Sequence, residues 1–172
     1  MFGERDDYTG NIIFDEPLSN PSQKGGSRML NSLKFSELSQ LRQHRIGFVF
    51  QGLRLFSELT AFENIALKNR LTGYKTNDDI MRMLECAGLA EKCDEKAARL
   101  SFGQQQRVAI IRALCQPFDF LFMDEPFSHL DDDNIKIMAD LVMQELKSKQ
   151  AGLILCSLGV EYPFNYCQKW KL

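Results

Sequence analysis

The chain has 172 residues and a formal net charge of −2, with 44% hydrophobic and 26% charged residues, as in an ordinary globular domain. This charge argues against a nucleic-acid partner held by bulk electrostatics, and no apolar run approaches the roughly 20 residues that span a bilayer. The charged residues at positions 4–7 argue against a secretory signal. The five cysteines form no Cys-x-x-Cys pair, so we expect a reduced, cytosolic protein in which Cys115 and Cys156 are small buried hydrophobes.

The first part of the chain alternates short apolar runs with polar segments. Residues 9–14 (TGNIIF) predict a short strand, and residues 15–27, rich in Pro, Ser, Asn and Gly, predict a loop. The KGGS sequence in this loop superficially resembles a phosphate-binding loop, but its lysine precedes the glycines. No G-x-x-x-x-G-K-[ST] sequence occurs in the 172 residues, so a flexible turn is the better interpretation. Ser36 is expected to cap a helix that runs to about His44.

A short apolar strand is predicted at residues 46–50 (IGFVF), ending at Gln51. Two helices follow it. Thr60 is expected to cap the first, and the second starts at Asn77. The apolar residues of the second helix share one face, as in a helix that packs on a core: Ile80, Met83, Leu84 and Ala87. Met81 and Met83 are interpreted as core residues rather than as a methionine-rich binding surface.

The most informative stretch is residues 100–131, LSFGQQQRVAIIRALCQPFDFLFMDEPFSHLD. After Gly103 it predicts a helix, with apolar residues at the spacing of one buried face, that stops before Pro117. Residues 118–123 predict a buried strand. Asp124 and Glu125 follow at the carboxyl end of this strand, where open α/β sheets place their ligands.

The remaining chain predicts one more helix and two strands. Acidic residues 131–133 suit the amino-terminal end of a helix, whose apolar stripe is Ile135, Met138, Val142 and Leu146. Residues 152–157 (GLILCS) predict a buried strand, and residues 167–172 a last short strand.

These motifs, in this order and at this spacing, resemble the nucleotide-binding subunit of ABC transporters. LSFGQ at 100–104 resembles the signature motif of that family, usually LSGGQ. FLFMDE at 120–125 resembles its Walker B strand, and FSHLD at 127–131 lies where its D-loop lies. The text from LRQHRIGFVFQ to FENIAL also resembles the family, within which the lipoprotein-release and macrolide-export group is the most similar.

The resemblance implies an α/β fold, a P-loop NTPase-type core with a mostly parallel sheet and a small helical subdomain at about residues 60–100. On this interpretation residues 1–172 form a single, incomplete domain that lacks the N-terminal P-loop portion. The family also implies ATP and Mg²⁺ as cofactors. It implies two protein partners, a second nucleotide-binding subunit and a membrane subunit, at the inner face of the cell membrane.

The resemblance assigns the hydrolytic chemistry to three residues. Asp124 would hold Mg²⁺, through water, and Glu125 would polarise the attacking water as general base. Gln51 would belong to the Q-loop and reach both the Mg²⁺ and the water. Taken alone, Gln51 would be interpreted as a solvated glutamine after a strand, but the sequence around it resembles the family.

The signature and D-loop residues would act on the nucleotide of the opposite subunit. Ser101, Gly103 and Gln104 would offer a hydroxyl, a backbone N–H and a side-chain amide to its γ-phosphate, while Asp131 would carry the D-loop role. Phe102 stands where the family usually has glycine. Residues 100–131 therefore contain halves of two different sites. Arg107 and Arg112 on the following helix are expected to make structural or surface contacts.

Two departures from the family concern the phosphates. The Walker A loop has no counterpart, and Leu158, in Ser-Leu-Gly at 157–159, stands where the family usually has the histidine of Thr-His-Asp. Leucine cannot replace the hydrogen bond of that histidine. Two explanations remain open: the chain is a fragment of a complete ATPase subunit, inactive alone, or it is a degenerate subunit that binds no ATP and offers its signature motif to a partner.

Overall fold

The computed structural model describes residues 13–15 and 27–170. The contacts between residues divide the chain into two units, 1–42 and 43–172. Parts of two predictions, the strand at 9–14 and the loop at 15–27, lie outside the described residues. The expected extent of the domain, a single one over residues 1–172, stays a prediction.

The first unit contains a short antiparallel pair of strands. β1 (Ile13–Asp15) pairs with β2 (Ser27–Met29), and a 3₁₀ turn, η1 (Leu30–Ser32), follows. α1 (Phe35–His44) is the helix that the sequence predicts, and it spans the boundary between the two units. The prediction that Ser36 caps this helix is wrong. Ser36 lies inside the helix, because the helix begins one residue earlier. The backbone N–H of Lys34 donates to the Glu37 carboxylate over 2.8 Å and satisfies this end of the helix instead.

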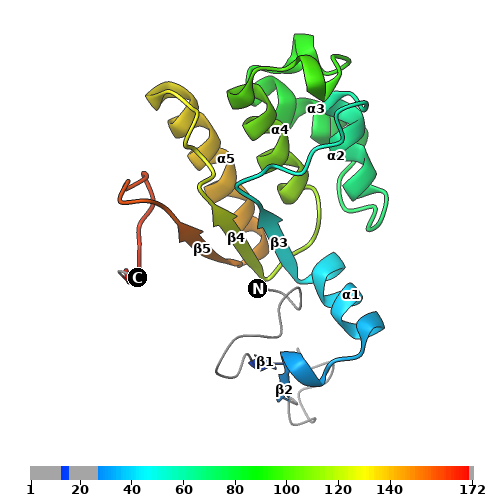
Figure 1. Cartoon of the computed structure of the whole chain (residues 1–172), viewed down its shortest axis with the longest axis vertical. Helices are drawn as coiled ribbons and strands as arrows, with labels where there is room; N and C mark the ends of the chain where they lie inside the picture. The colour runs from blue at the N-terminus through cyan, green and yellow to red at the C-terminus, as the bar shows by residue number, and fades with distance from the viewer. Residues whose placement is uncertain (1–12, 16–26, 171–172) are drawn as a thin grey trace. The chain divides into compact units, whose positions relative to one another are not determined.

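The second unit is built on a parallel sheet of three strands (Figure 1). β4 (Phe120–Asp124) lies in the middle, between β3 (Ile46–Val49) and β5 (Gly152–Cys156). Because all three strands run in the same direction, their carboxyl ends meet at one edge of the sheet. This mostly apolar, parallel arrangement with covering helices is the α/β fold that the sequence predicts.

Four helices accompany this sheet. They are α2 (Ala61–Asn69), α3 (Asn77–Cys86), α4 (Phe102–Leu114) and α5 (Asp132–Lys149), with 3₁₀ turns η2 (Ala90–Lys92) and η3 (Ala97–Arg99) between α3 and α4. Figure 1 shows α2, α3 and α4 grouped together and α5 running behind the strands. One apolar core joins α2 to α5 with the strands, and the predicted stripes of α3 and α5 point into it.

The helix starts follow local sequence rules. Thr60 and Thr76 each accept a hydrogen bond from a first-turn N–H, and an acidic residue three positions on, Glu63 or Asp79, returns a bond to the N–H of the threonine. This reciprocal capping box satisfies two N–H groups that would otherwise lack a partner. The predicted cap at Thr60 is confirmed.

Three sequence predictions about apolar segments are wrong in part. The strand predicted as buried at 118–123 is β4, in which Phe120 is exposed, because alternate side chains of a strand point to opposite faces. Cys115 is buried as expected, but Cys156 is exposed. Residues 167–170 form no strand, since no neighbouring segment offers them a ladder of backbone hydrogen bonds.

A buried ion cluster joins the loop before α3 to the end of α5. Glu145 accepts from both Lys75 and Lys149, each over 2.6 Å, and the three side chains are between 5 and 18% exposed. Lys149 also donates to the carbonyl of Leu114 over 3.0 Å. We call Glu145, Lys75 and Lys149 the ion cluster.

Within the part of the chain that the structure describes, no helix is long and apolar enough to cross a membrane.

Candidate functional site

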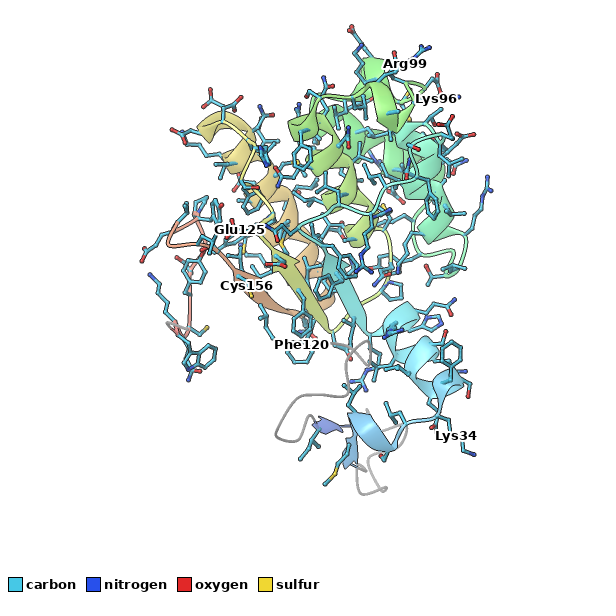
Figure 2. All side chains as sticks on the ribbon, in the orientation of Figure 1. Lys34, Lys96, Arg99, Phe120, Glu125 and Cys156 are labelled. Atoms are coloured by element: carbon cyan, nitrogen blue, oxygen red, sulfur yellow. The ribbon has the colours of Figure 1, made fainter. Side chains whose placement is uncertain are left out.

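The predicted site residues gather at the carboxyl edge of the sheet. Asp124 ends β4 and is paired with Cys156 of β5, and Gln51 follows the end of the neighbouring β3. Figure 2 shows Glu125 beyond the tip of β4, with Phe120 at the opposite end of the same strand. Sequence reasoning therefore places Asp124, Glu125 and Gln51 at the same edge correctly.

Glu125 has a backbone conformation that few acidic residues adopt. Its φ is +47°, in the left-handed region, which costs a residue with a side chain on the order of 1–3 kcal/mol. Its N–H donates to the carbonyl of Cys156 over 3.1 Å, and its carboxylate accepts the N–H of Leu158. Its carbonyl accepts hydrogen bonds from the side chains of Gln106 and Ser128. The surrounding chain thus holds Glu125 in a turn that is unfavourable in isolation.

At the position where the family usually has a histidine, Leu158 offers this carboxylate a backbone N–H. The side chain of Leu158 is 86% exposed and points away into solvent, so its N–H is the group that contacts Glu125. A carboxylate oxygen has more than one acceptor site, so this bond still leaves Glu125 able to accept a hydrogen bond from water.

The sheet edge carries negative charge. Partial burial, followed by the charges of Asp124 and Glu125, raises the pKa of the Cys156 thiol. Burial, and then the charge of Glu125, also raises the pKa of Tyr162. The electrostatic part of both shifts comes from the carboxylates, whose negative charge would also attract a cation.

These residues fit a magnesium ion that keeps most of its water ligands. The described residues contain no group of three or more His, Cys, Asp or Glu side chains placed to enclose a metal. Mg²⁺ does not need such a cage, because it is held in nucleotide sites by one or two carboxylates together with waters and phosphate oxygens. Asp124 and the amide oxygen of Gln51 are ligands of the appropriate kind.

The signature residues form the amino-terminal end of α4. The hydroxyl of Ser101 accepts from the N–H of Gln104 over 3.3 Å, and the side-chain oxygen of Gln104 accepts from the N–H of Ser101 over 2.9 Å. The cap uses acceptor atoms of both side chains. It does not use the hydroxyl hydrogen of Ser101, the side-chain NH₂ of Gln104 or the N–H groups of Phe102 and Gly103, which are donors of the kind that bind an anion at the start of a helix.

Gly103 lets α4 approach the segment that resembles the D-loop. A Cβ atom at this position would lie 2.8 Å from the carbonyl oxygen of His129 and 3.3 Å from Leu130 Cδ2. The neighbouring Phe102 is 46% exposed, and its ring meets the His129 ring edge-on with 4.3 Å between centroids. Phe102, which stands where the family usually has glycine, therefore packs on the exposed side of the same segment, and the first turn of α4 remains helical.

Gln106 is a site residue that sequence reasoning missed. It is 1% exposed, and its Nε2 donates to the carbonyl of Glu125 over 3.0 Å and to the hydroxyl of Ser128 over 3.3 Å. Its Oε1 accepts from the N–H of His129 over 3.1 Å, and Ser128 in turn donates to the Glu125 carbonyl over 3.2 Å. One buried amide therefore binds both ends of the turn 125–129.

Asp131 caps α5. Its carboxylate accepts from the backbone N–H of Asn134 over 2.8 Å and from the Asn134 side chain over 2.9 Å. These bonds, and then the charge of Arg107, hold the pKa of Asp131 below its usual value. Arg107 itself donates to Asn134 over 2.8 Å and to the carbonyl of Ala87 over 2.6 Å, a structural role as expected. The D-loop role of Asp131 stays a prediction.

The loop after Gln51 is fixed from α4. Leu53 and Arg54 both have positive φ, and the guanidinium of Arg112 donates to their carbonyls over 2.6 and 2.7 Å. Burial lowers the pKa of Arg112. A cavity of about 140 Å³ opens beside this loop, lined also by residues 97–98, Phe102 and Gln105. Arg112 thus stabilises the loop, in agreement with the structural role predicted for it.

Comparisons with known proteins agree with this arrangement. Residues 2–128 match the family model described as ABC transporter. The chain is 36% identical, over 134 residues, to a lipoprotein-releasing system ATP-binding protein, LolD 2, of Rhodopseudomonas palustris. It is also 36% identical, over 143 residues, to a methionine import ATP-binding protein, MetN 4, of Oceanobacillus iheyensis. A solved structure, the dimeric bacterial ABC transporter cassette MJ0796, aligns with a TM-score of 0.62 and 31% identity.

The aligned parts differ in their share of each protein. They cover 76% of this chain and 58% of LolD 2, 81% of this chain and 40% of MetN 4, and 77% of this chain and 62% of MJ0796. The chain therefore spans less than two thirds of the length of each of these relatives.

Proposed function

Because the chain belongs to the ABC transporter ATP-binding family, we propose that it is the ATP-binding and ATP-hydrolysing subunit of a membrane transporter, coupling hydrolysis to transport through a separate membrane subunit. The observation that carries this proposal is the placement of Asp124 and Glu125 at the carboxyl edge of the sheet, together with the capped start of α4. The family places the chemistry of ATP hydrolysis on these two features.

The residues of this chain would divide the hydrolytic work. Asp124 and Gln51 would hold Mg²⁺, which when bound neutralises charge on the phosphates of ATP. Glu125 would accept a proton from the attacking water as the general base. Leu158 contributes only the N–H that orients this carboxylate.

The signature half would act on a second subunit. Ser101, Gly103 and Gln104 would donate to a phosphate held by the partner cassette, in keeping with the dimeric form of the related MJ0796. Asp131 would lie beside the same nucleotide.

On this proposal the protein is cytoplasmic and peripheral at the inner face of the membrane. Residues 1–172 form one incomplete nucleotide-binding domain, with its helical subdomain at about 60–100.

A second candidate function rests on the lack of a Walker A sequence in the 172 residues. On this alternative the chain binds no ATP of its own and serves as an interaction module that presents Ser101–Gln104 to an intact partner. The intact hydrogen bonding of the α4 cap favours it, because both bonds of this cap lie within Ser101–Gln104.

Calorimetric titration of the purified 172-residue protein with Mg·ATP separates the two functions. Micromolar binding excludes the interaction module, whereas no heat at millimolar ATP excludes independent nucleotide binding. For the first function, the complete gene product should hydrolyse Mg·ATP, and replacing both Asp124 and Glu125 by alanine should abolish turnover. Undiminished hydrolysis in that double variant would refute the assigned roles.

A further inference from the structure

The turn 125–129, which we call the acidic turn, and the amino-terminal half of α4 share a single buried amide. Gln106 bonds the Glu125 carbonyl on one side and the His129 N–H on the other. The two partners fix which end of the Gln106 amide faces which, because the backbone N–H of His129 can only donate and the carbonyl of Glu125 can only accept. No apolar side chain could satisfy both groups.

The acidic turn needs this support. Glu125 has a φ of +47°, and the peptide group that follows it is held by Gln106 and by Ser128, the latter itself a partner of Gln106. Removing the amide would leave the His129 N–H without its acceptor and leave the Glu125 carbonyl with one bond of the two. The left-handed conformation would then have fewer interactions to offset its strain.

We propose that Gln106 is a positioning residue that sets the orientation of the Glu125 carboxylate through the backbone of the acidic turn, and ties that orientation to the signature end of α4. The proposal rests on the function proposed above only in giving Glu125 the role of base. The positioning itself is a property of the described residues. It connects the half of the site that would use Glu125 with the half that contains Ser101–Gln104.

Amide hydrogen exchange, followed by NMR on the full 172-residue chain, tests the positioning directly. In Gln106→Met, the His129 N–H should exchange about fivefold to tenfold faster, the factor expected for the loss of one hydrogen bond. The Leu158 N–H, which donates to the Glu125 carboxylate but does not contact Gln106, should also exchange faster, since the carboxylate moves. A residue that only anchored His129 would leave Leu158 unchanged.

Two further variants sharpen the test. Gln106→Glu, studied with its carboxylate ionised, keeps an acceptor for His129 but loses the donor to the Glu125 carbonyl, so Leu158 should be affected more than His129. Gln116→Met is the matched control, because Gln116 is an equally buried glutamine that donates to the carbonyl of Ile46, at the opposite end of the sheet. It should change neither amide. Wild-type exchange at Leu158 in Gln106→Met would overturn the proposal.

The rate of ATP hydrolysis gives a second test, independent of the hydrogen-exchange measurements. If the chain hydrolyses Mg·ATP, Gln106→Met should lower kcat by about tenfold or more and leave KM within about twofold, because positioning of the base acts on the transition state. An unchanged kcat alongside faster exchange at Leu158 would also overturn the proposal. If the complete gene product hydrolyses no ATP, the proposed function fails, and the exchange at Leu158 alone decides the role of Gln106.

Discussion

Because α4 closely approaches the acidic turn at Gly103, adding a single methyl group at this position should destabilise the protein. In Gly103→Ala, the added Cβ would lie 2.8 Å from the His129 carbonyl oxygen, closer than carbon and oxygen approach without strain. The obstacle is a backbone atom, and it cannot easily move, because the N–H of His129 is held by Gln106. Either the first turn of α4 or the acidic turn has to shift by a few tenths of an ångström.

Two opposing effects set the size of the change. Alanine in place of glycine favours a helix by roughly 0.5–1 kcal/mol. Forcing an extra carbon into a packed contact costs about 1–3 kcal/mol. The second effect is the larger at this separation, so we expect Gly103→Ala to lower the free energy of unfolding by about 1 kcal/mol, equivalent to about 2–4 °C in Tm for a chain of this size.

Urea denaturation followed by circular dichroism measures this difference, with Gly52→Ala as the control. Gly52 has no atom within 4 Å of the position of an added Cβ and no positive φ, so its replacement should be neutral or stabilising by up to about 1 kcal/mol. If Gly103→Ala were as stable as Gly52→Ala, the packing of α4 on the acidic turn would be wrong, and with it the geometry assigned to the Gln106 hydrogen bonds.

Other variants test separate parts of the fold. Glu145→Ala should destabilise the protein by about 3 kcal/mol in thermal or urea unfolding, since it leaves two buried lysines of the ion cluster without a partner, whereas Glu161→Ala, at an exposed ion pair, should cost less than about 1 kcal/mol. Burial raises the pKa of the Cys115 thiol to about 12, so this cysteine should resist alkylation at pH 8 in the folded protein and react only on unfolding; labelling of native protein at this site, by mass spectrometry, would contradict its burial. Hydrogen bonds from Thr76 lower the pKa of Asp79 from 3.8 to about 2, so its contribution to stability should be present above about pH 4 and be lost as the pH falls towards 2; in Asp79→Asn this part of the acid dependence should disappear.

Features with local causes could be predicted from the sequence. The cap at Thr60 follows from a threonine and a glutamate three residues apart, and the buried face of α3 follows from its apolar spacing. The placement of Asp124 and Glu125 at a sheet edge follows from a strand that ends in two acids. Each of these depends on residues only a few positions apart, where sequence patterns are most informative.

Features that depend on distant contacts were missed or wrong. Gln106 lies in a polar run, QQQR, in which nothing distinguishes it from its neighbours, and its partners lie 19 and 23 residues further along the chain. The positive φ of Glu125 is imposed by those partners and is not a preference of glutamate. Cys156 has apolar neighbours, but the alternation of β5 turns its side chain to the exposed face, and the sequence does not say which face is covered.

The two halves of the candidate site are therefore joined by contacts between α4 and the acidic turn, although the nucleotides they would touch belong to different subunits. Gly103 meets the His129 carbonyl, and Gln106, one turn further along α4, bonds the N–H of the same residue and the carbonyl of Glu125. A phosphate that drew the first turn of α4 outward would pull on both contacts at once. The acidic turn would have to follow or lose hydrogen bonds, so the orientation of Glu125 would depend on whether the signature end of its own chain is occupied. Such coupling needs no motion of a whole subdomain, because the two elements are already so close that a Cβ added at Gly103 would lie 2.8 Å from the His129 carbonyl oxygen.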